Sequence, residues 1–294
     1  MNARRGTALL VVLAVTVLTV SALAMIVRVT STASMARHTS RSMTIAADLL
    51  HATDTPITTW LNTMSSDVVL PPDVMTPRTP VLLDRWTAGD TDFEVTITAW
   101  DQYAMVPADQ VRGPLGAAVV DPELKNIVGA TKLPRGQPAG LDLFLVAART
   151  VDGARVYPAA PGQSHEPSDD DAGEPSEQRP ALGAIVATHN PAPGRINVNT
   201  APMALIEAAL RRTQRGDIKQ ILEARGLGER TILPAAPQQR RGRRRSLELV
   251  GVSDAWAFRV DILVGGLHRS WWCVYSRPRP SKPWECVQRL AILQ

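Results

Sequence analysis

The chain has 294 residues, of which 45% are hydrophobic, and it carries 23 Pro, 19 Gly and a formal net charge of +4. This composition excludes wholesale disorder, a multi-span membrane protein and a disulfide-dense mini-protein. A strongly basic nucleic-acid binder would carry a more lopsided charge than this. The two cysteines, Cys273 and Cys286, have no accompanying His pair, which excludes a zinc site built on them.

The N-terminal segment is the longest apolar run. The 21 residues from Thr7 to Val27 carry no charge, and as a helix they would span about 31 Å, the thickness of a hydrocarbon core. A cleaved secretory signal is the alternative, with Ala-Leu-Ala at 22–24 as its cleavage site, but its apolar region is normally about 7–15 residues long. The sequence therefore predicts a single-pass anchor, and Arg4 and Arg5 favour a cytoplasmic N-terminus.

The helical pattern continues beyond the apolar run. No Pro or Gly occurs between Thr7 and Thr55, and apolar residues recur at helical spacing; they are Met35, Ala36, Met43, Ala46, Ala47 and Leu50. These features predict one long helix over 7–52, which Asp54-Thr55-Pro56 terminates. A long helix with no other element of the same chain around it needs partner proteins that cover its apolar surface. The pattern therefore suggests that this helix assembles side by side with helices of other subunits.

The leader carries a family resemblance. A short basic segment that ends in Gly6, followed by an apolar helix that begins at Thr7, resembles the class III signal of type IV pilins and type II secretion pseudopilins. The resemblance implies that a prepilin peptidase cleaves after Gly6 and methylates Thr7. Most family members carry Glu at the position of Val11. Its absence is the pattern of the K-type minor pseudopilins, the general secretion pathway protein K family, where a tip subunit has no neighbour above it to pair with a buried carboxylate.

This resemblance implies an assembly function for the chain. It predicts a non-enzymatic minor pseudopilin that caps the tip of the type II secretion pseudopilus and helps to initiate its assembly. The implied partners are the I-, J- and H-type minor pseudopilins, the prepilin peptidase and the inner-membrane secretion platform. The bulk of the chain would lie in the periplasm. A minor pilin of a type IV pilus, which shares the leader and the anchor, remains an alternative.

Alternating and apolar runs predict the strands of the ectodomain. They lie at 93–100, 141–148, 151–157, 182–188, 256–264, 271–275 and 284–293, whereas 101–140 is expected to be loop. If Tyr275 pairs with Trp284, Cys273 lies opposite Cys286, and a cross-strand disulfide becomes plausible in an oxidising compartment. A pair of free thiols is the alternative.

The sequence Ile-Asn-Val-Asn-Thr-Ala-Pro at 196–202 is the most specific internal motif. Asn199 or Thr200, with Asn197 in the same motif, can cap a helix whose first turn holds Pro202. Helices are predicted over 203–212 and 217–225, which form a helical hairpin. K-type pseudopilins carry a similar motif, and so do membrane-anchored helix-hairpin-helix DNA receptors. The paired glycines of those receptors are missing here, so we favour two packed helices, with nucleic acid an unlikely partner.

Two charged segments interrupt the ectodomain. The acidic, Pro-rich stretch 161–180 is predicted to be a solvated loop; its Asp169–Asp171 run leaves a calcium site open, although no ligand can be assigned. The five Arg between 240 and 245 predict a solvated linker, with nucleic-acid or anionic-lipid binding as the alternative. No cofactor is expected.

Catalytic motifs are absent from the sequence. It has no G-x-S-x-G, H-E-x-x-H or P-loop pattern, and none of its five His has a His partner three or four residues away.

The predicted organisation is α+β, with a long N-terminal transmembrane helix packed on an antiparallel sheet, as in pilins, and a small helical-hairpin insertion. The predicted segments are a leader at 1–6, an anchor and assembly helix at 7–52, an α/β region at 53–160, an acidic loop at 161–180, a hairpin region at 181–228, a basic linker at 229–246 and a C-terminal sheet at 247–294.

Overall fold

The computed structural model describes residues 3–74, 78–88, 91–107, 110–111, 113–120, 157, 182–189, 191, 194–213, 218–233 and 247–292, with the side chains of the first helix from Thr19 onward. The elements in chain order are α1 (Ala3–Ala52), α2 (Asp54–Thr63), β1 (Thr79–Ala88), β2 (Thr91–Asp101), the 3-10 helix η1 (Gln102–Ala104), α3 (Pro114–Val119), α7 (Leu182–Ile185), β3 (Arg195–Asn197), α8 (Met203–Thr213), α9 (Ile218–Gly226), β4 (Glu248–Val250), β5 (Ala255–Val264), β6 (Leu267–Ser276) and β7 (Glu285–Ile292).

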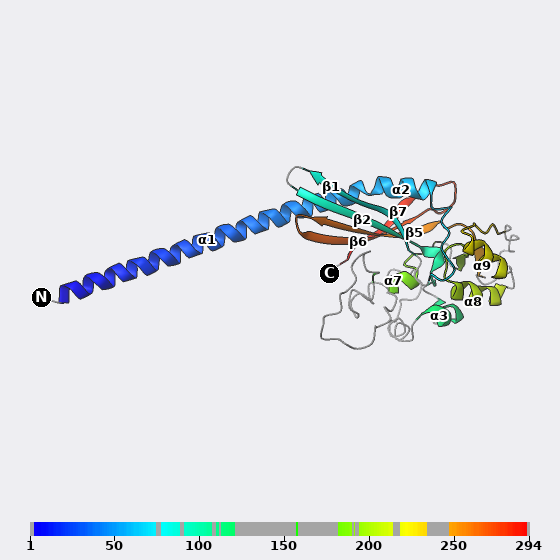
Figure 1. Cartoon of the computed structure of the whole chain (residues 1–294), viewed down its shortest axis with the longest axis horizontal. Coiled ribbons are helices and arrows are strands. Elements are labelled where there is room, and N and C mark those ends of the chain that lie inside the picture. Colours follow the sequence, from blue (N-terminus) through cyan, green and yellow to red (C-terminus); the bar gives the residue numbers. More distant parts are fainter. Residues whose placement is uncertain are drawn as a thin grey trace.

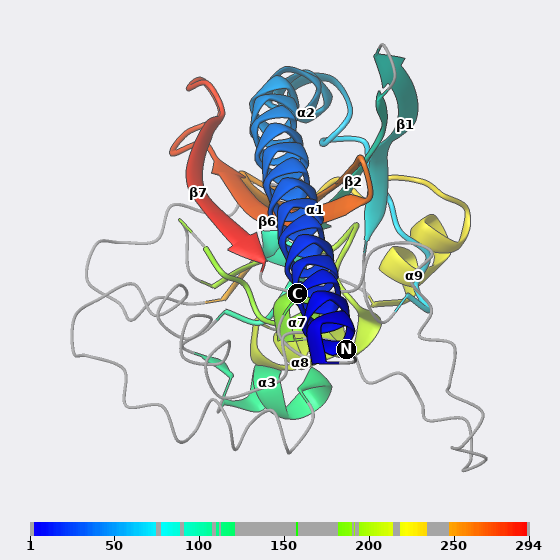
Figure 2. The same cartoon turned by 90° about the vertical axis from the view of Figure 1, so that its left-hand side faces the viewer.

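A five-stranded antiparallel sheet in the order β1-β2-β5-β6-β7 carries the long helix. The C-terminal part of α1, together with α2, lies across one face of this sheet, and the rest of α1 extends freely past its end (Figure 1). Viewed along α1, the helix runs over the middle of the sheet with β1 and β7 at the two edges (Figure 2). This is the α+β arrangement that the sequence predicted.

Alternation along the strands builds one core on each face of the sheet. Val95, Ile97, Phe258 and Val260 belong to the buried cluster under α1 and α2. Their neighbours in sequence point to the opposite face, where Trp100 and Trp272 join a second cluster at a ring-centroid distance of 5.3 Å. The central strands β2, β5 and β6 therefore carry buried residues on both faces of the sheet.

The second cluster is built largely by a long insertion. The chain leaves the sheet after β2 and returns at β5, and the region between them contains α3, α7, α8, α9 and the short parallel pair β3–β4. Leu205, Ile206 and Ala209 of α8 and Ile221 of α9 are buried in this cluster. Figure 1 places α3, α8 and α9 at the end of the molecule away from the free part of α1.

Several predicted elements are confirmed. The long helix is Ala3–Ala52, and β2, β5, β6 and β7 cover the strands predicted at 93–100, 256–264, 271–275 and 284–293. The two predicted helices of the hairpin are α8 and α9. The strands predicted at 141–148 and 151–157 lie outside the described residues, apart from the buried Tyr157.

One predicted strand is wrong. The stretch 182–188 begins as the helical turn α7, and its pairing is a single parallel bridge between Val186 and Val106. A short apolar run buried on all sides does not distinguish strand from helix. The stretch 101–140, predicted to be loop with little regular structure, contains the short helices η1 and α3 among its described residues, which agrees with that prediction. Helix α2 and strand β1 were not predicted from the sequence. Asp54-Thr55-Pro56 does end α1, but it also begins α2, because Pro is tolerated in a first helical turn.

Candidate functional site

The free part of α1 exposes a long row of apolar side chains. Every side chain from Thr19 to Arg41 is exposed, and the apolar ones include Val20 at 61%, Leu23 at 64% and Met25 at 70% exposure. The described part of the chain has one helix long and apolar enough to cross a membrane, and it lies near the N-terminus. At 50 residues, α1 is about 75 Å long. It can therefore cross a bilayer and still reach the sheet.

The C-terminal part of α1 is held by close packing on the sheet. Ser42, Ala46, Leu50 and Thr53 are buried at a spacing of three or four residues, which places them on one helix face. The following helix α2 adds Trp60, whose ring meets Trp256 edge-on at 5.0 Å. The same sheet contact therefore fixes α1 and α2 together.

The turn between β5 and β6 approaches α1 closely. Gly265 and Gly266 have φ values of 53° and 77°, which glycine adopts without the steric cost of a Cβ. A Cβ at Gly265 would lie 3.0 Å from atoms of both His38 and Ser42. The absence of a side chain at Gly265 therefore lets the turn contact α1 where the helix leaves the sheet.

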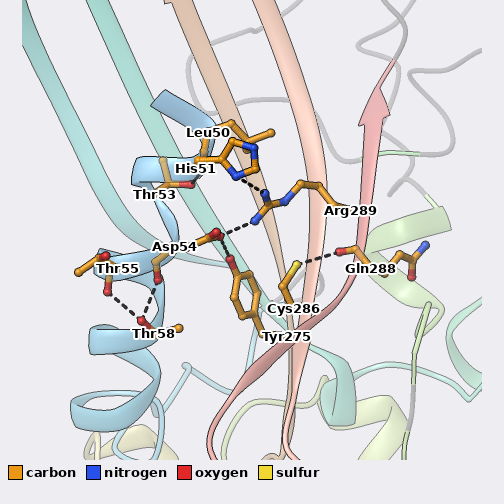
Figure 3. A network of polar contacts seen from close by, with 10 residues as sticks. All are labelled: Leu50, His51, Thr53, Asp54, Thr55, Thr58, Tyr275, Cys286, Gln288 and Arg289. Atoms are coloured by element: carbon orange, nitrogen blue, oxygen red, sulfur yellow. Dashed lines mark hydrogen bonds and ion pairs between the residues drawn. The ribbon is translucent and has the colours of Figure 1, made fainter. Parts of the chain in front are cut away.

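A polar network locks the junction of α1 and α2 onto strands β6 and β7 (Figure 3). The carboxylate of Asp54 accepts hydrogen bonds from the Tyr275 hydroxyl and from the Arg289 guanidinium, with which it forms an ion pair. The guanidinium also lies 3.2 Å from Nδ1 of His51. Burial, together with the bond to Asp54, raises the pKa of Tyr275, so the phenol stays protonated as a donor.

Cys273 and Cys286 are both free in the structure, which is the alternative that the sequence left open beside a disulfide. The register of β6 and β7 shifts between Val274 and Tyr275, which places Cys286 opposite Tyr275 and Cys273 opposite Arg289. The sequence offered no signal for this irregularity. Cys273 is buried and Cys286 is exposed, and burial raises the pKa of the Cys273 thiol to about 12. The buried thiol is therefore protonated at neutral pH.

Asp101, at the end of β2, accepts hydrogen bonds that fix the insertion to the sheet. Its buried carboxylate accepts hydrogen bonds from Asn197 at 2.7 Å, from the Thr200 hydroxyl at 2.6 Å and from the Tyr103 N–H at 2.8 Å. The Asn197 amide also donates to Ser253 at 3.1 Å. Burial raises the pKa of Asp101, although each of these donors lowers it.

The predicted capping role of Asn197, Asn199 and Thr200 is wrong. The helix that follows begins only at Met203. The Asn197 side chain accepts from the Asn199 N–H at 3.1 Å within the motif, whereas Asn199 and Thr200 bond to residues outside it. Asn199 accepts from the Thr231 N–H at 2.8 Å and donates to the Gly251 carbonyl at 3.0 Å. The motif thus joins distant segments of the insertion, a task that local capping rules cannot reveal.

Arg225 of α9 performs a similar joining task. Its buried guanidinium donates to the carbonyl oxygens of Leu70 at 2.7 Å, Pro71 at 2.8 Å and Ala201 at 2.6 Å. Burial lowers its pKa to about 10, which still leaves it charged at neutral pH. The hairpin helix is therefore tied to the segment between α2 and β1, and this Arg is unavailable for contacts with phosphate.

The leader residues lie at the free end of α1. Gly6, Thr7 and Val11 are helical in backbone, but their side chains lie outside the described residues. The segment 161–180 with Asp169–Asp171, the connection between α8 and α9 at 214–217, and the Arg residues at 240–245 also lie outside them. The predictions made on these segments remain predictions.

The described residues contain little that could bind a metal ion or a small ligand. Within the described ranges, no group of three or more His, Cys, Asp or Glu side chains could hold a metal ion. A cavity of about 350 Å³ lies where α1 meets the β1–β2 and β5–β6 turns. Its lining includes Arg41, Arg85, Asp92 and Glu94. Because these charges are of both signs, the cavity favours neither an anion nor a cation.

Comparisons with known proteins complete the description. No protein-family model and no curated protein matches the chain. A solved structure of the GspK-GspI-GspJ complex from the type 2 secretion system of enterotoxigenic Escherichia coli contains a chain with 14% identity and a TM-score of 0.38; the match covers 86% of the present chain and 98% of that one.

Proposed function

We propose that this protein is a non-enzymatic minor pseudopilin of a type II secretion system, anchored in the inner membrane by α1. One observation carries the proposal: a single 50-residue helix is docked on an antiparallel sheet over its last turns and is exposed and apolar over its free part. Such a surface is unstable in water and requires lipid or other helices around it. The N-terminus would be cytoplasmic and the sheet and insertion periplasmic.

The leader sequence supports the finer assignment. The Gly6-Thr7 junction fits cleavage and methylation by a prepilin peptidase, and Val11 in place of Glu fits a K-type subunit at the tip of the pseudopilus. The insertion at the far end from α1 would then stand at the outermost point of the assembly. The proposed partners are the I-, J- and H-type minor pseudopilins and the inner-membrane platform.

Mass spectrometry of the mature N-terminus tests the processing. We expect a methylated Thr7 in cells that contain a prepilin peptidase, and no cleavage at this site after Gly6→Asp. The matched control is Ala24→Leu, which removes the small residue that an ordinary signal peptidase requires, keeps the span apolar, and should leave the Thr7 terminus unchanged. A mature protein that begins near residue 25 would contradict the proposal.

Membrane extraction tests the anchor separately. Val20→Arg places a charge within the apolar span and should cost about 3 kcal/mol of insertion free energy, so alkaline carbonate should release more of this variant. Ser34→Arg adds the same charge to an exposed position outside the span and should remain membrane-bound. Equal release of both variants would argue against a transmembrane α1.

Assembly is tested by co-purification from detergent extracts. The full chain should recover I- and J-type minor pseudopilins expressed in the same membrane, whereas a variant that lacks residues 7–27 should not. Salt-dependent binding of duplex DNA by the full chain, without such recovery, would instead favour a DNA receptor.

A further inference from the structure

Strand β1 forms an open edge of the sheet. Its residues pair with β2 alone among the described strands, in a continuous register from Leu82–Ile97 to Ala88–Thr91. Figure 2 shows β1 at the outer edge, on the side away from β7. A strand in this position presents a row of unpaired backbone groups, which form a template for a further strand.

The usual protections of an edge strand are concentrated at the start of β1. Pro80 and the register shift between Pro80 and Leu82 would hinder pairing there. From Leu83 to Thr87, however, five consecutive residues are exposed without Pro or a bulge. Leu83 is 69% exposed and Trp86 is 38% exposed, although these are the apolar side chains that a soluble edge normally avoids.

The direction of the backbone groups follows from one contact. The N–H of Arg85 donates to the Asp84 carboxylate at 2.8 Å, so it does not pair with β2 and points outward. Because N–H and C=O groups alternate sides along an antiparallel strand, the backbone groups of Leu83 and Thr87 point outward as well. The outward groups of Leu83, Arg85 and Thr87 can thus form ladder hydrogen bonds once a partner strand displaces the Asp84 carboxylate from the Arg85 N–H.

We propose that the outer edge of β1 binds an extended segment of a partner protein, which adds a sixth strand to the sheet. The edge reads Leu83-Asp84-Arg85-Trp86, apolar at both ends with one acidic and one basic residue between them. Directly opposed residues of an antiparallel strand interact most strongly when apolar meets apolar and acid meets base. The segment would therefore read apolar, acidic, basic, apolar from its N-terminus.

A second copy of this chain does not fit the edge. Antiparallel pairing of two β1 edges requires a two-fold axis normal to the sheet. Since α1 runs roughly along the strands (Figure 1), the two α1 helices would then point in opposite directions and could not share one membrane face. Parallel two-fold pairing brings Asp84 and Arg85 near their own copies, which places like charges together. The exclusion of antiparallel pairing rests on the membrane anchoring proposed above, whereas the binding site on β1 does not depend on that anchoring.

A synthetic peptide probes the site directly. The probe is a labelled, end-capped ten-residue peptide with Val-Glu-Lys-Val at its centre, and its binding to the full chain in detergent is measured by fluorescence anisotropy. The native chain should bind it about fivefold more tightly than a Val-Lys-Glu-Val peptide. The double variant Asp84→Lys and Arg85→Glu, which keeps the net charge, should reverse this preference.

A substitution that removes a backbone N–H distinguishes binding by added-strand hydrogen bonds from binding by side-chain contacts alone. Leu83→Pro removes one outward N–H without breaking a bond to β2, whereas Leu83→Ala shortens the side chain and keeps that N–H. We expect the Pro variant to bind the probe about tenfold more weakly than the Ala variant. Hydrogen exchange should slow at the amides of Leu83, Arg85 and Thr87 when the peptide binds, and unchanged far-UV circular dichroism shows that the variants are folded.

Equal affinity of the Pro and Ala variants, or binding without slower exchange at these three amides, would overturn the proposal. A probe that fails to bind the native chain at millimolar concentration would do so as well. None of these outcomes depends on whether Gly6 is cleaved or α1 is inserted in a membrane, so the proposed function stands or falls by its own experiments.

Discussion

Asp54 and Arg289 form an ion pair across 235 residues of sequence, and this contact joins the start of α2 to the last strand of the sheet. It lies at the point where α1 ends, so it sets where the long helix is fixed relative to the sheet. Tyr275 donates to the same carboxylate. The packed face of α1 provides the contact area with the sheet, and this network fixes the position of the helix along the strands.

Asp54→Ala should loosen the docked end of α1. Because the side chain of Asp54 is 40% exposed, solvent screens the ion pair, and we expect a loss of roughly 1 kcal/mol of unfolding free energy from the pair and the Tyr275 hydrogen bond together. Urea unfolding followed by Trp fluorescence measures it. Asp48→Ala, at an exposed position of the same helix, is the control. An Asp54→Ala variant as stable as this control would show that the network contributes nothing measurable.

Gly265→Ala should disturb α1 more than Gly266→Ala. Both glycines have positive φ, so either substitution strains the backbone. Only the Cβ at position 265 would meet α1, at 3.0 Å from His38 and Ser42, whereas position 266 has open space. The difference in unfolding free energy between the two variants therefore isolates the helix contact, and we expect about 1–3 kcal/mol. Two variants of equal stability would mean that the helix adjusts freely.

Arg225→Lys should release the hairpin from the segment between α2 and β1. A Lys ammonium cannot reproduce the planar fork that bonds three carbonyl oxygens, and the freed carbonyls would lose buried partners. We expect about 2 kcal/mol of destabilisation. Hydrogen exchange at residues 64–74 and 218–226 should quicken together. Faster exchange in α9 alone would indicate that Arg225 stabilises only its own helix.

Asp101 should make stability depend on pH. Burial raises its folded pKa above the ordinary 3.8. A raised carboxyl pKa gives a stability contribution that is complete below the unfolded value and is lost as pH rises through the folded value. The free energy of unfolding of the native chain, relative to that of Asp101→Asn, should therefore increase as the pH falls from 7 toward 4. A difference that is independent of pH would show that Asp101 does not titrate in this range.

Asp101→Ala leaves the Asn197 and Thr200 donors without their acceptor in a buried site. We expect about 3 kcal/mol of destabilisation at pH 7. Exchange should quicken over β3 and the start of α8, while α1 remains docked. An equal effect on α1 would mean that the sheet and the insertion unfold as one unit.

Periodicity alone determined the long helix, the alternating strands β2 and β5, and the two hairpin helices, since each has a strong local pattern: an uninterrupted apolar run, a two-residue alternation or an amphipathic face. These patterns act over a few residues and need no distant partner. The free apolar half of α1, which carries the proposed function, could be predicted for the same reason.

Only the tertiary structure decided what the polar residues do. Asn199 and Thr200 satisfy the local rules of a helix cap, yet their partners lie on β2, beyond β4 and at Thr231, where buried donors and acceptors outweigh the local option. Likewise, the shift between β6 and β7 separates Cys273 from Cys286 and brings Arg289 to Asp54. The register of paired strands, the open edges of a sheet and buried hydrogen-bond networks depend on which distant segments of the chain meet. The free energy of such contacts cannot be judged from any short stretch of sequence.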